Sequence, residues 1–553
     1  MRILLLTSYS GEQFNNAPPI GLYRLKNFVE DAGIPCDILD LSLDSPDSFL
    51  VRAAAGEFAI IGISVSHYHM IEDLKLIERF LEATTGQHSL VIAGGQEASY
   101  NFEQWLDGGV QAVILGYGER PLLRMAQTLR DNPGGGVEAI SRIPGIVCRV
   151  YGLTKVNPAL SMTRAEFELL TYEKVLLLDV PYERYWEQAR QHDNALNFRT
   201  SQFVSDLVRV YTASHCPNRC GFCSSHRFLT FSQGRKSKIF MLDAPKVFHL
   251  IMHYVKQYGA KGVLFSDDEF LVSRERAEEF LELLIHARHT GVLPNNPMLN
   301  CQARVTDFLS KKNGGIVDRP FLKLLLEAGF HSVSLGVESF SERLLATSVM
   351  NKRGYSEKQA INLIDTMLEV GLVPQVNIIL FIPEATREDI LHNIRRGMEI
   401  ISKGCTIALT TYLFSIPGAP IYLDPGYPTT LTRYISRATG RNIDVTGYFI
   451  PHDPVVAMAA EALPEVLNTE IDRFIQTGIW PYGKLHKTLI GILTFIAIAD
   501  VFGETEQAES WREALAAFVH SPGANLSSPI DPNRIRMKKA SMQDAPERTF
   551  YGK

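Results

Sequence analysis

The chain has 553 residues, of which 46% are hydrophobic and 21% charged, and its formal net charge is −6. This length predicts two or three domains, and the composition is that of a globular protein with enough apolar residues for cores. The acidic balance argues against a nucleic-acid or membrane-surface role. The opening apolar run Met1–Leu6 turns polar too early for a secretory signal, and Leu489–Ala499 is too short to span a bilayer. A cytoplasmic location is therefore expected.

Residues 1–142 alternate short β-rich runs with amphipathic helical segments. This alternation predicts a doubly wound α/β domain, in which helices cover both faces of a parallel sheet. Glycines follow the ends of two runs, at Gly94-Gly95 and at Gly116 and Gly118. The carboxyl edge of such a sheet binds ligands, and glycine lets a ligand approach the backbone closely. The β-rich runs are Arg2–Thr7, Cys36–Leu41, Ala59–Val65, Leu90–Ala93 and Ala112–Leu115.

Three further regions follow along the chain. Residues 143–206 show little periodicity and are interpreted as a linker. Residues 207–423 contain six strand–helix units, which predict a partial (β/α)6 barrel with its active site at the carboxyl ends of the strands. Residues 424–553 are expected to form a helical C-terminal region that could cover the barrel mouth with Trp480, Tyr482 and His486. The expected barrel strands are Leu207–Thr212, Gly262–Phe265, Met298–Ala303, Ser332–Val337, Gln375–Ile382 and Thr406–Phe414.

Three of the seven cysteines, Cys216, Cys220 and Cys223, have a C-x3-C-x2-C spacing directly after a predicted strand. An odd number of cysteines spread over a large chain is not a disulfide framework, and the other four are interpreted as small buried hydrophobic residues. Three thiolates on one loop can bind three irons of a cubane cluster and leave the fourth iron open. Zinc is the alternative, with His215 or His226 as a fourth ligand, although structural zinc sites usually take four ligands in two close pairs.

This loop, with Phe222 before the last cysteine, resembles the signature of the radical S-adenosylmethionine (SAM) superfamily. The resemblance implies that SAM chelates the open iron of a [4Fe–4S] cluster and is cleaved to a 5′-deoxyadenosyl radical. It also implies that Asp268, Arg304 and Glu338 bind SAM. From the residues alone, Arg304 and Glu338 could each instead be part of an ordinary barrel salt bridge, and Asp267 or Asp268 could cap the following helix. The matching segments are Phe265–Phe270, Cys301–Arg304, Leu335–Ser339 and Ile379–Thr386, the last with Ile382 where relatives often have glycine.

The first domain resembles the cobalamin-binding domain of the B12-dependent radical SAM family. The matching segments are Ala17–Leu22, Ile61–Ser66, Ile92–Gly95 and Leu115–Glu119. A D-x-H-x-x-G motif is absent, which in this family goes with a displaced lower base. His67 or His69 could bind cobalt from below, although a loop histidine is more often solvated. The resemblance implies cobalamin contacts from Pro19, Ser64, Gly94, Gly95, Gly116, Gly118 and Glu119.

The combined resemblance implies a cobalamin-dependent, class B radical SAM methyltransferase that methylates an unactivated carbon of a small-molecule or peptide substrate. One alternative is cyclisation or rearrangement without methyl transfer. A non-enzyme alternative is a cobalamin or iron–sulfur sensor, which would not need an open-iron loop beside a SAM-binding barrel. The predicted partners are the substrate and a reducing protein such as flavodoxin or ferredoxin, with no nucleic acid and no membrane.

Overall fold

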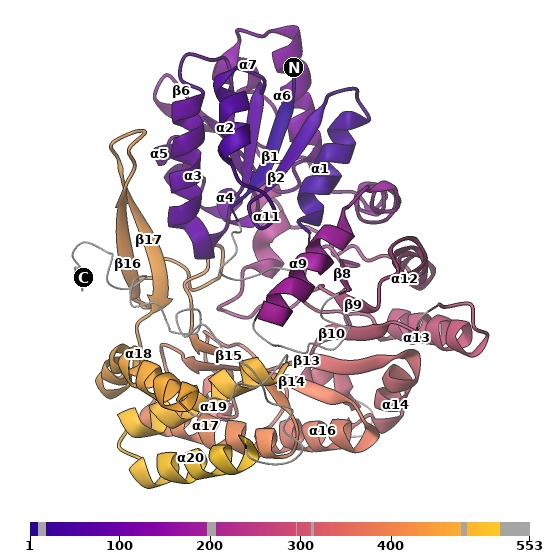
Figure 1. The fold of residues 1–553 in the computed structure, drawn as a ribbon, viewed down its shortest axis with the longest axis vertical. Helices are drawn as coiled ribbons and strands as arrows, with labels where there is room; N and C mark the ends of the chain where they lie inside the picture. Colours follow the sequence, from indigo (N-terminus) through magenta and orange to yellow (C-terminus); the bar gives the residue numbers. More distant parts are fainter. Residues whose placement is uncertain (9–17, 196–205, 295, 311–314, 477–483, 520–553) are drawn as a thin grey trace.

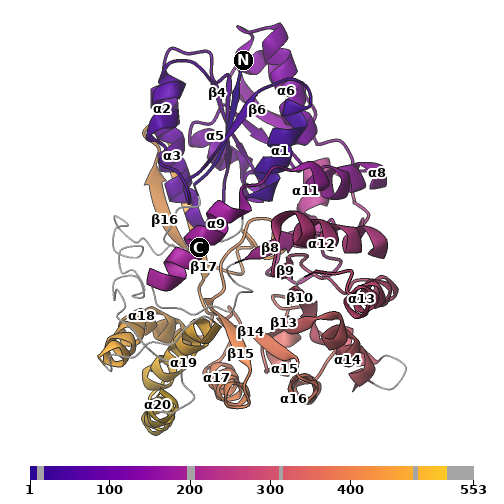
Figure 2. The same cartoon turned by 45° about the vertical axis from the view of Figure 1, so that its right-hand side comes forward.

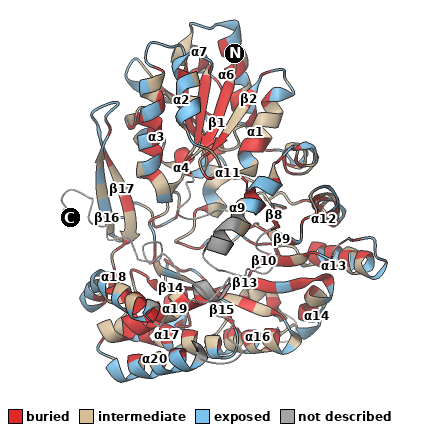
Figure 3. Ribbon diagram, viewed as in Figure 1, coloured by how far each residue is buried: buried red, intermediate tan, exposed pale blue. Residues whose placement is uncertain are grey.

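A computed structural model describes residues 1–8, 18–195, 206–294, 296–310, 315–476 and 484–519 of the chain. Two sheets lie at different heights along the long axis of the molecule, and three C-terminal helices lie at the end opposite the first sheet (Figure 1). The strands of both sheets are mostly buried, whereas the outer faces of the surrounding helices are exposed (Figure 3). No helix among the described residues is long and apolar enough to cross a bilayer.

The first sheet has seven strands in the order β2-β1-β3-β4-β5-β6-β7. Strands β1 to β5 are parallel, and β1 pairs with both β2 and β3. One face packs against α1 (Ile20–Glu30) and α6 (Glu119–Asp131), and the other against α2 (Asp47–Ala54), α3 (Met70–Ala83) and α5 (Phe102–Asp107). The predicted doubly wound domain is therefore confirmed. Its parallel strands are β1 (Ile3–Thr7), β2 (Cys36–Asp40), β3 (Ile60–Ser64), β4 (Leu90–Gly94) and β5 (Ala112–Ile114).

The first sheet extends past Arg142 into the segment that was expected to be a linker. Two antiparallel strands, β6 (Ile146–Val150) and β7 (Leu153–Val156), add to its edge. They are joined by Tyr151-Gly152, both at positive φ (52° and 78°), as a tight hairpin turn requires. The usual Asn-Gly or Asp-Gly signal is absent, so the sequence did not indicate this hairpin. Helix α9 (Tyr182–Ala195) then leads toward the second sheet (Figure 2).

The second sheet has six parallel strands in chain order, which form the expected open partial barrel. They are β8 (Leu207–Val210), β9 (Gly262–Phe265), β10 (Met298–Arg304), β13 (Phe330–Glu338), β14 (Val373–Phe381) and β15 (Thr406–Tyr412). The helices between them are α12 (Ala244–Tyr258), α13 (Arg274–His289), α14 (Arg319–Ala328), α16 (Glu357–Val370) and α17 (Arg387–Ser402). Each of these helices begins after a residue whose side chain accepts a hydrogen bond from a backbone N–H of the first turn. For this reason the starts of these helices could be predicted from the sequence. These caps are Asp243, Ser273, Asp318, Ser356 and Thr386.

The C-terminal region contains the expected helices and also a β-hairpin that was not expected. Helix α18 (Pro454–Ile475) is one continuous helix, and Leu463, Leu467 and Ile471 keep one of its faces buried. Helices α19 (Lys484–Val501) and α20 (Thr505–Val519) follow, and α19 packs against β15. Trp480, Tyr482 and the polar tail from Ser521 lie outside the described residues, as does the side chain of His486.

The hairpin of β16 (Thr429–Ile435) and β17 (Asn442–Phe449) reaches back from the barrel to the first domain, along α3 (Figure 1). Glu78 on α3 is almost fully buried and accepts hydrogen bonds from Tyr434 Oη, Arg437 N and Arg437 Nε at 2.8, 2.8 and 2.9 Å. Ile443 of β17 belongs to the apolar core of the first domain. The two domains are thus connected through α9 and also contact each other through the hairpin.

Candidate active site

A cavity of about 700 Å³ lies between the carboxyl edge of the first sheet and the carboxyl ends of β8 and β9. All seven residues that were expected to contact cobalamin line this cavity, and so does Asp268. The seven are Pro19, Ser64, Gly94, Gly95, Gly116, Gly118 and Glu119. The side facing the barrel is lined by Ser214, His215, Ser266 and the carboxylates of residues 267–269. The same cavity therefore borders both the first domain and the barrel.

The glycine edge fits a large planar ligand because side chains are missing where the backbone turns. Gly95 has φ +111°, and a Cβ there would lie 3.3 Å from Val65 O. Gly116 has φ +71°, and a Cβ there would lie 2.9 Å from Ser232 Oγ, which belongs to the barrel domain. Glycine at these positions therefore both permits the backbone conformation and leaves room at the boundary of the two domains.

Glu119 is 3% exposed and pairs with Arg24, a residue that sequence reasoning missed. Arg24 donates from Nε and Nη2 to Glu119 Oε1, and its guanidinium also lies 5.4 Å from the ring centroid of Tyr117. The pair joins α1 to the first residue of α6, and both residues line the cavity. Glu119 thus already has a strong partner in this structure.

His67 does not line the cavity. Its Nδ1 lies 3.6 Å from Glu97 Oε2, and burial lowers the pKa of His67 to about 4. Burial likewise raises the pKa of Glu97 to about 7. The idea that His67 binds cobalt from below therefore receives no geometric support from this arrangement, and His69 also lies outside the cavity lining.

The three cysteines lie on a loop between β8 and α11 (Phe228–Gln233), and other segments fix the backbone of this loop. Gly221 packs so closely that a Cβ there would lie 2.2 Å from Ser348 O. Phe222 N donates to Val349 O at 3.1 Å, and Ile421 N donates to Gly221 O at 3.2 Å. The C-x3-C-x2-C loop is therefore a fixed element of the barrel mouth.

The cysteine thiols are free, and Cys216 Sγ accepts from Asn218 N and Asn218 Nδ2, both at 3.4 Å. Burial raises the pKa of all three thiols, that of Cys216 to about 12, so a bound cation is needed to hold them as thiolates. Among the described residues, no three His, Cys, Asp or Glu side chains surround one point as ligands of a single zinc ion would. A cubane uses a different iron for each thiolate, which suits three cysteines spread along a loop. The other cysteines, at 36, 148, 301 and 405, are buried as expected.

Arg304 and Glu338 lie at the ends of β10 and β13 but do not line the cavity, and they do not pair with each other. Arg304 Nη1 donates to Asn218 Oδ1, within the cysteine loop. Glu338 Oε1 instead accepts from Lys352 Nζ at 2.8 Å. Glu338 thus forms the ordinary barrel salt bridge considered as its alternative role, whereas Arg304 makes a hydrogen bond to the cysteine loop.

Asp267 does not cap the following helix, because Ser273 does so. Asp267 accepts instead from Thr212 N, Thr212 Oγ1 and Ala213 N at 2.6, 2.5 and 2.8 Å. Burial raises its pKa to about 6. Asp267 therefore fixes the chain just before the cysteine loop, while its neighbour Asp268 faces the cavity.

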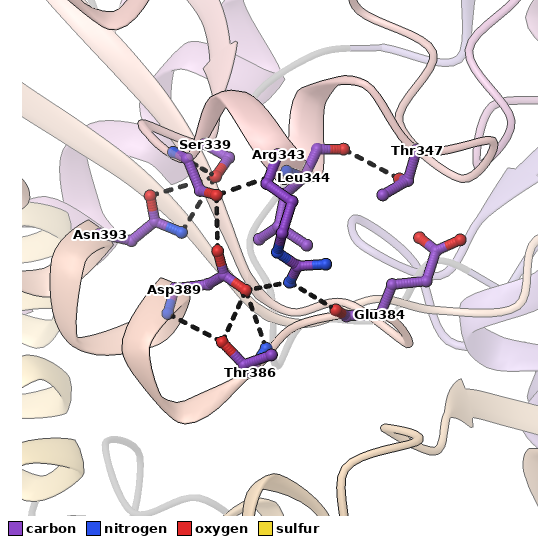
Figure 4. A network of polar contacts seen from close by, with 9 residues as sticks. Ser339, Arg343, Leu344, Thr347, Glu384, Thr386, Asp389 and Asn393 are labelled. Atoms are coloured by element: carbon purple, nitrogen blue, oxygen red, sulfur yellow. Dashed lines mark hydrogen bonds and ion pairs between the residues drawn. The ribbon is translucent and has the colours of Figure 1, made fainter.

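Glu338 sits in a left-handed backbone conformation (φ +64°), where the register between β13 and β14 also shifts. The residues that follow are held by a buried polar network (Figure 4). Phe340 N donates to Asn393 Oδ1 at 2.7 Å, and Ser341 Oγ donates to Asp389 Oδ1 at 2.5 Å. Because a non-glycine residue at positive φ is strained, this network maintains the conformation that aims Glu338 at the barrel mouth.

Glu269 is a further candidate that sequence reasoning did not single out. Its Oε2 accepts from Asn218 Nδ2 at 3.2 Å, whereas no N–H or hydroxyl group of the described residues donates to its buried Oε1. Burial, followed by the neighbouring Asp307, raises the pKa of Glu269 to about 10. A buried polar atom without such a donor beside the cysteine loop is consistent with a ligand that carries hydrogen-bonding groups. The buried thiols, this atom and the glycine-edged cavity together fit a cluster, SAM and cobalamin.

Comparisons with known proteins agree with this geometry. The B12 binding domain family matches residues 11–126, and the radical SAM superfamily matches residues 210–396. The curated protein PH0819 of Pyrococcus horikoshii, described as an uncharacterized methyltransferase, is 27% identical over 181 residues, which are 33% of this chain and 34% of that protein. The match thus spans only about a third of that relative.

Two solved structures share the fold. The radical SAM methyltransferase TsrM of Kitasatospora setae, in a structure with tryptophan substrate and a SAM analog, superposes with a TM-score of 0.60 at 18% identity, over 83% of this chain and 88% of that one. The cobalamin-dependent SAM radical enzyme OxsB superposes with a TM-score of 0.62 at 14% identity, over 94% and 75%. A second TsrM structure contains cobalamin and a [4Fe–4S] cluster. The chain therefore carries a B12 binding domain followed by a radical SAM domain, and these two domains imply cobalamin, SAM and a [4Fe–4S] cluster as cofactors.

Proposed function

We propose that this enzyme transfers a methyl group from SAM to an unactivated carbon of a small-molecule or peptide substrate. The observation that carries the proposal is the cavity shared by the glycine edge of the first domain and the strand ends of the second. Hydrogen abstraction and methyl delivery at one carbon require both cofactors within reach of it, which a shared cavity allows. The methyltransferase names of TsrM and PH0819 support the same reaction class.

The proposal gives each group of residues a role. Cys216, Cys220 and Cys223 hold the cluster, and Asp268, Arg304 and Glu338 bind SAM. The cobalamin contacts are Pro19, Ser64, Gly94, Gly95, Gly116, Gly118 and Glu119. When bound, the cluster and SAM supply the radical that removes a hydrogen atom, and cobalamin supplies the methyl group. The chain itself orients these groups and encloses the reacting atoms.

Methyl-labelled SAM tests the reaction. Anaerobic holoenzyme with a reducing protein such as flavodoxin or ferredoxin is incubated with extract of cells that express the chain with its genomic neighbours. Methyl transfer predicts a labelled product, with S-adenosylhomocysteine and 5′-deoxyadenosine formed together. An unlabelled, rearranged product with 5′-deoxyadenosine alone would instead establish the cyclase or rearrangement reaction.

The cluster assignment has its own test. Anaerobically reconstituted protein should contain about four irons and four sulfides per chain. Replacing all three loop cysteines by alanine should abolish both, and a full cluster in that triple variant would contradict the assignment. A cytoplasmic location is proposed with it, because cytosolic reductants would keep the seven cysteines reduced.

A further inference from the structure

Three exposed arginines lie on or beside the cysteine loop. Arg219 stands between the first and second cysteines of the loop, and Arg227 follows the third cysteine by four residues. Arg353 lies in the connection from α15 (Glu342–Leu345) to α16. Within the described part of the chain, none of the three forms an ion pair with a carboxylate. In a chain whose formal net charge is −6, this surface therefore carries a local excess of positive charge.

Backbone carbonyls hold two of these guanidinium groups in place without neutralising them. Arg353 donates from Nε and Nη2 to Ala346 O at 3.2 and 2.7 Å. Arg227 Nη1 donates to Gly418 O at 3.4 Å. A carbonyl oxygen carries only a partial charge, so each arginine keeps most of its attraction for an anionic partner.

The segment before Arg353 holds the cysteine loop. Val349 O accepts from Phe222 N at 3.1 Å, and Asn351 Nδ2 donates to Arg219 O at 2.7 Å. Residues 348–352 thus form the support of the loop, and Ser348 and Asn351 in this support are exposed. Arg219 and Arg353 therefore belong to one fixed surface over the loop.

A second segment, residues 421–427, completes this surface. Ile421 N donates to Gly221 O at 3.2 Å, and the hydroxyls of Tyr427 and Ser348 lie 2.8 Å apart. Between these contacts Leu423 is 71% exposed, in a left-handed backbone conformation with φ +58°. A bulky residue is strained there, and such strain is common at functional sites. Asp424 is also exposed, but three arginines outweigh this one carboxylate.

An exposed apolar side chain flanked by arginines is typical of a protein–protein interface. The loop beneath this surface carries the three cysteines assigned to the cluster, and each cleavage of SAM consumes one electron. The electron carrier must therefore approach this loop. Opposite charges on two proteins speed their encounter, and electron-transfer interfaces are small and transient.

We propose that Arg219, Arg227, Arg353 and Leu423 form the docking surface for the reducing partner, an acidic one-electron carrier protein of the flavodoxin or ferredoxin class. In the transfer the carrier is oxidised by one electron and the cluster is reduced by one, and no atom moves between them. The inference rests on the cluster assignment made above. It adds to that assignment the side of the barrel from which the electron arrives.

The first test measures binding rather than turnover. Anaerobically reconstituted protein is titrated with an acidic flavodoxin, and separately with an acidic ferredoxin, by calorimetry at low ionic strength. Arg219→Glu combined with Arg353→Glu should weaken the affinity for the carrier at least about ten-fold. Arg219→Lys combined with Arg353→Lys keeps both charges and should retain most of the affinity. Lys323→Glu, which reverses an exposed charge on α14, is the matched control and should bind as wild type does.

Two further measurements separate charge from apolar contact and from damage to the loop. At an ionic strength of about 0.15 M screening shortens to about 8 Å, so the difference between wild type and the double glutamate variant should shrink. Leu423→Asn suits the left-handed backbone but removes the apolar side chain, so it should weaken binding at both ionic strengths. In stopped-flow experiments the double glutamate variant should be reduced more slowly by reduced flavodoxin, and at the wild-type rate by dithionite.

The proposal is overturned if neither carrier binds wild type at low ionic strength, or if the double glutamate variant binds as tightly as wild type. Equal slowing with flavodoxin and with dithionite would also overturn it, because the variant would then have altered the cluster site itself. If the double variant holds no cluster, its affinity for the carrier still decides, since binding is measured on the protein surface. Failure of the cluster assignment would be seen separately, in the iron and sulfide content of the triple cysteine variant.

Discussion

Gly221 provides a sharp test of whether backbone contacts hold the cysteine loop. In Gly221→Ala the new Cβ would lie 2.2 Å from Ser348 O, 2.7 Å from Val349 O and 3.0 Å from Val349 Cα. All three neighbours are backbone atoms, so a change of side-chain rotamer cannot relieve these close contacts. Ordinary contacts begin near 3.5 Å, so the loop or its support must move by at least about 1 Å.

The cost of this movement follows from what it disturbs. Overpacking of this kind costs about 1–3 kcal/mol, and the shift also strains the hydrogen bonds Phe222 N to Val349 O and Ile421 N to Gly221 O. Each of these contributes about 0.5–1.5 kcal/mol. A total of about 2–6 kcal/mol moves the equilibrium away from the native loop by at least about thirty-fold. The whole chain should remain folded, because the disturbance is confined to one loop.

The assay is the iron and sulfide content after anaerobic reconstitution, with thermal unfolding as a check of the fold. Gly221→Ala should hold well below the wild-type content. The control is Gly134→Ala, since a Cβ at Gly134 meets nothing within 4 Å and the backbone is not left-handed there. If Gly221→Ala acquires a complete cluster with an unchanged unfolding temperature, the proposed support of the loop is wrong.

Three further predictions concern the first domain. Glu78→Ala should free the β16–β17 hairpin at a cost of about 1–3 kcal/mol, seen as faster hydrogen exchange over residues 429–449, and unchanged exchange would contradict the docking. Gly95→Ala should weaken hydroxocobalamin binding in a spectroscopic titration. Gly86→Ala should not, because Gly86 is also at positive φ but has open space around it. Equal affinities of the two variants would show that Gly95 does not contact cobalamin. Burial raises the pKa of Asp73 from 3.8 to about 7. Between these pH values the folded state keeps the carboxyl proton of Asp73 and the unfolded state loses it. The free energy of unfolding should therefore fall as pH rises from about 4 to about 7, by up to about 4 kcal/mol. Asp73→Asn should flatten this dependence in urea titrations and the exposed Asp131→Asn should not; the same slope in Asp73→Asn would refute the cause.

The barrel could be predicted from sequence because its signals are local. Helix α12 begins at the cap Asp243 and ends at Gly259, which has a left-handed backbone, and both are readable from composition. The apolar runs of β9 and β13 are bounded in the same way. Three cysteines within one loop likewise form a signal that needs no tertiary information. The predicted bounds of these elements therefore agree with the structure to within a few residues.

The unpredicted features depend on contacts between segments far apart in the chain. The strands β16 and β17 are half-exposed and find their partner surface on α3 and α5, so no local pattern marks them. Arg24 gains its role from Glu119, 95 residues away. Lys352 carries no motif of its own, and only the fold brings it beside Glu338. In the sequence, such residues cannot be distinguished from ordinary surface charges, because only the folded chain brings their partners close.

The return of the hairpin to the first domain has a consequence for the order of assembly. Glu78 and Arg437 are 359 residues apart, which at ordinary rates of synthesis corresponds to about 20–70 s on the ribosome. All seven strands of the first sheet are synthesised before any strand of the barrel. During that interval the glycine edge of this sheet faces water, whereas in the finished chain it faces the barrel. Corrinoid supplied during translation would therefore meet an open half-site. Corrinoid supplied afterwards would have to enter between two domains that already contact each other.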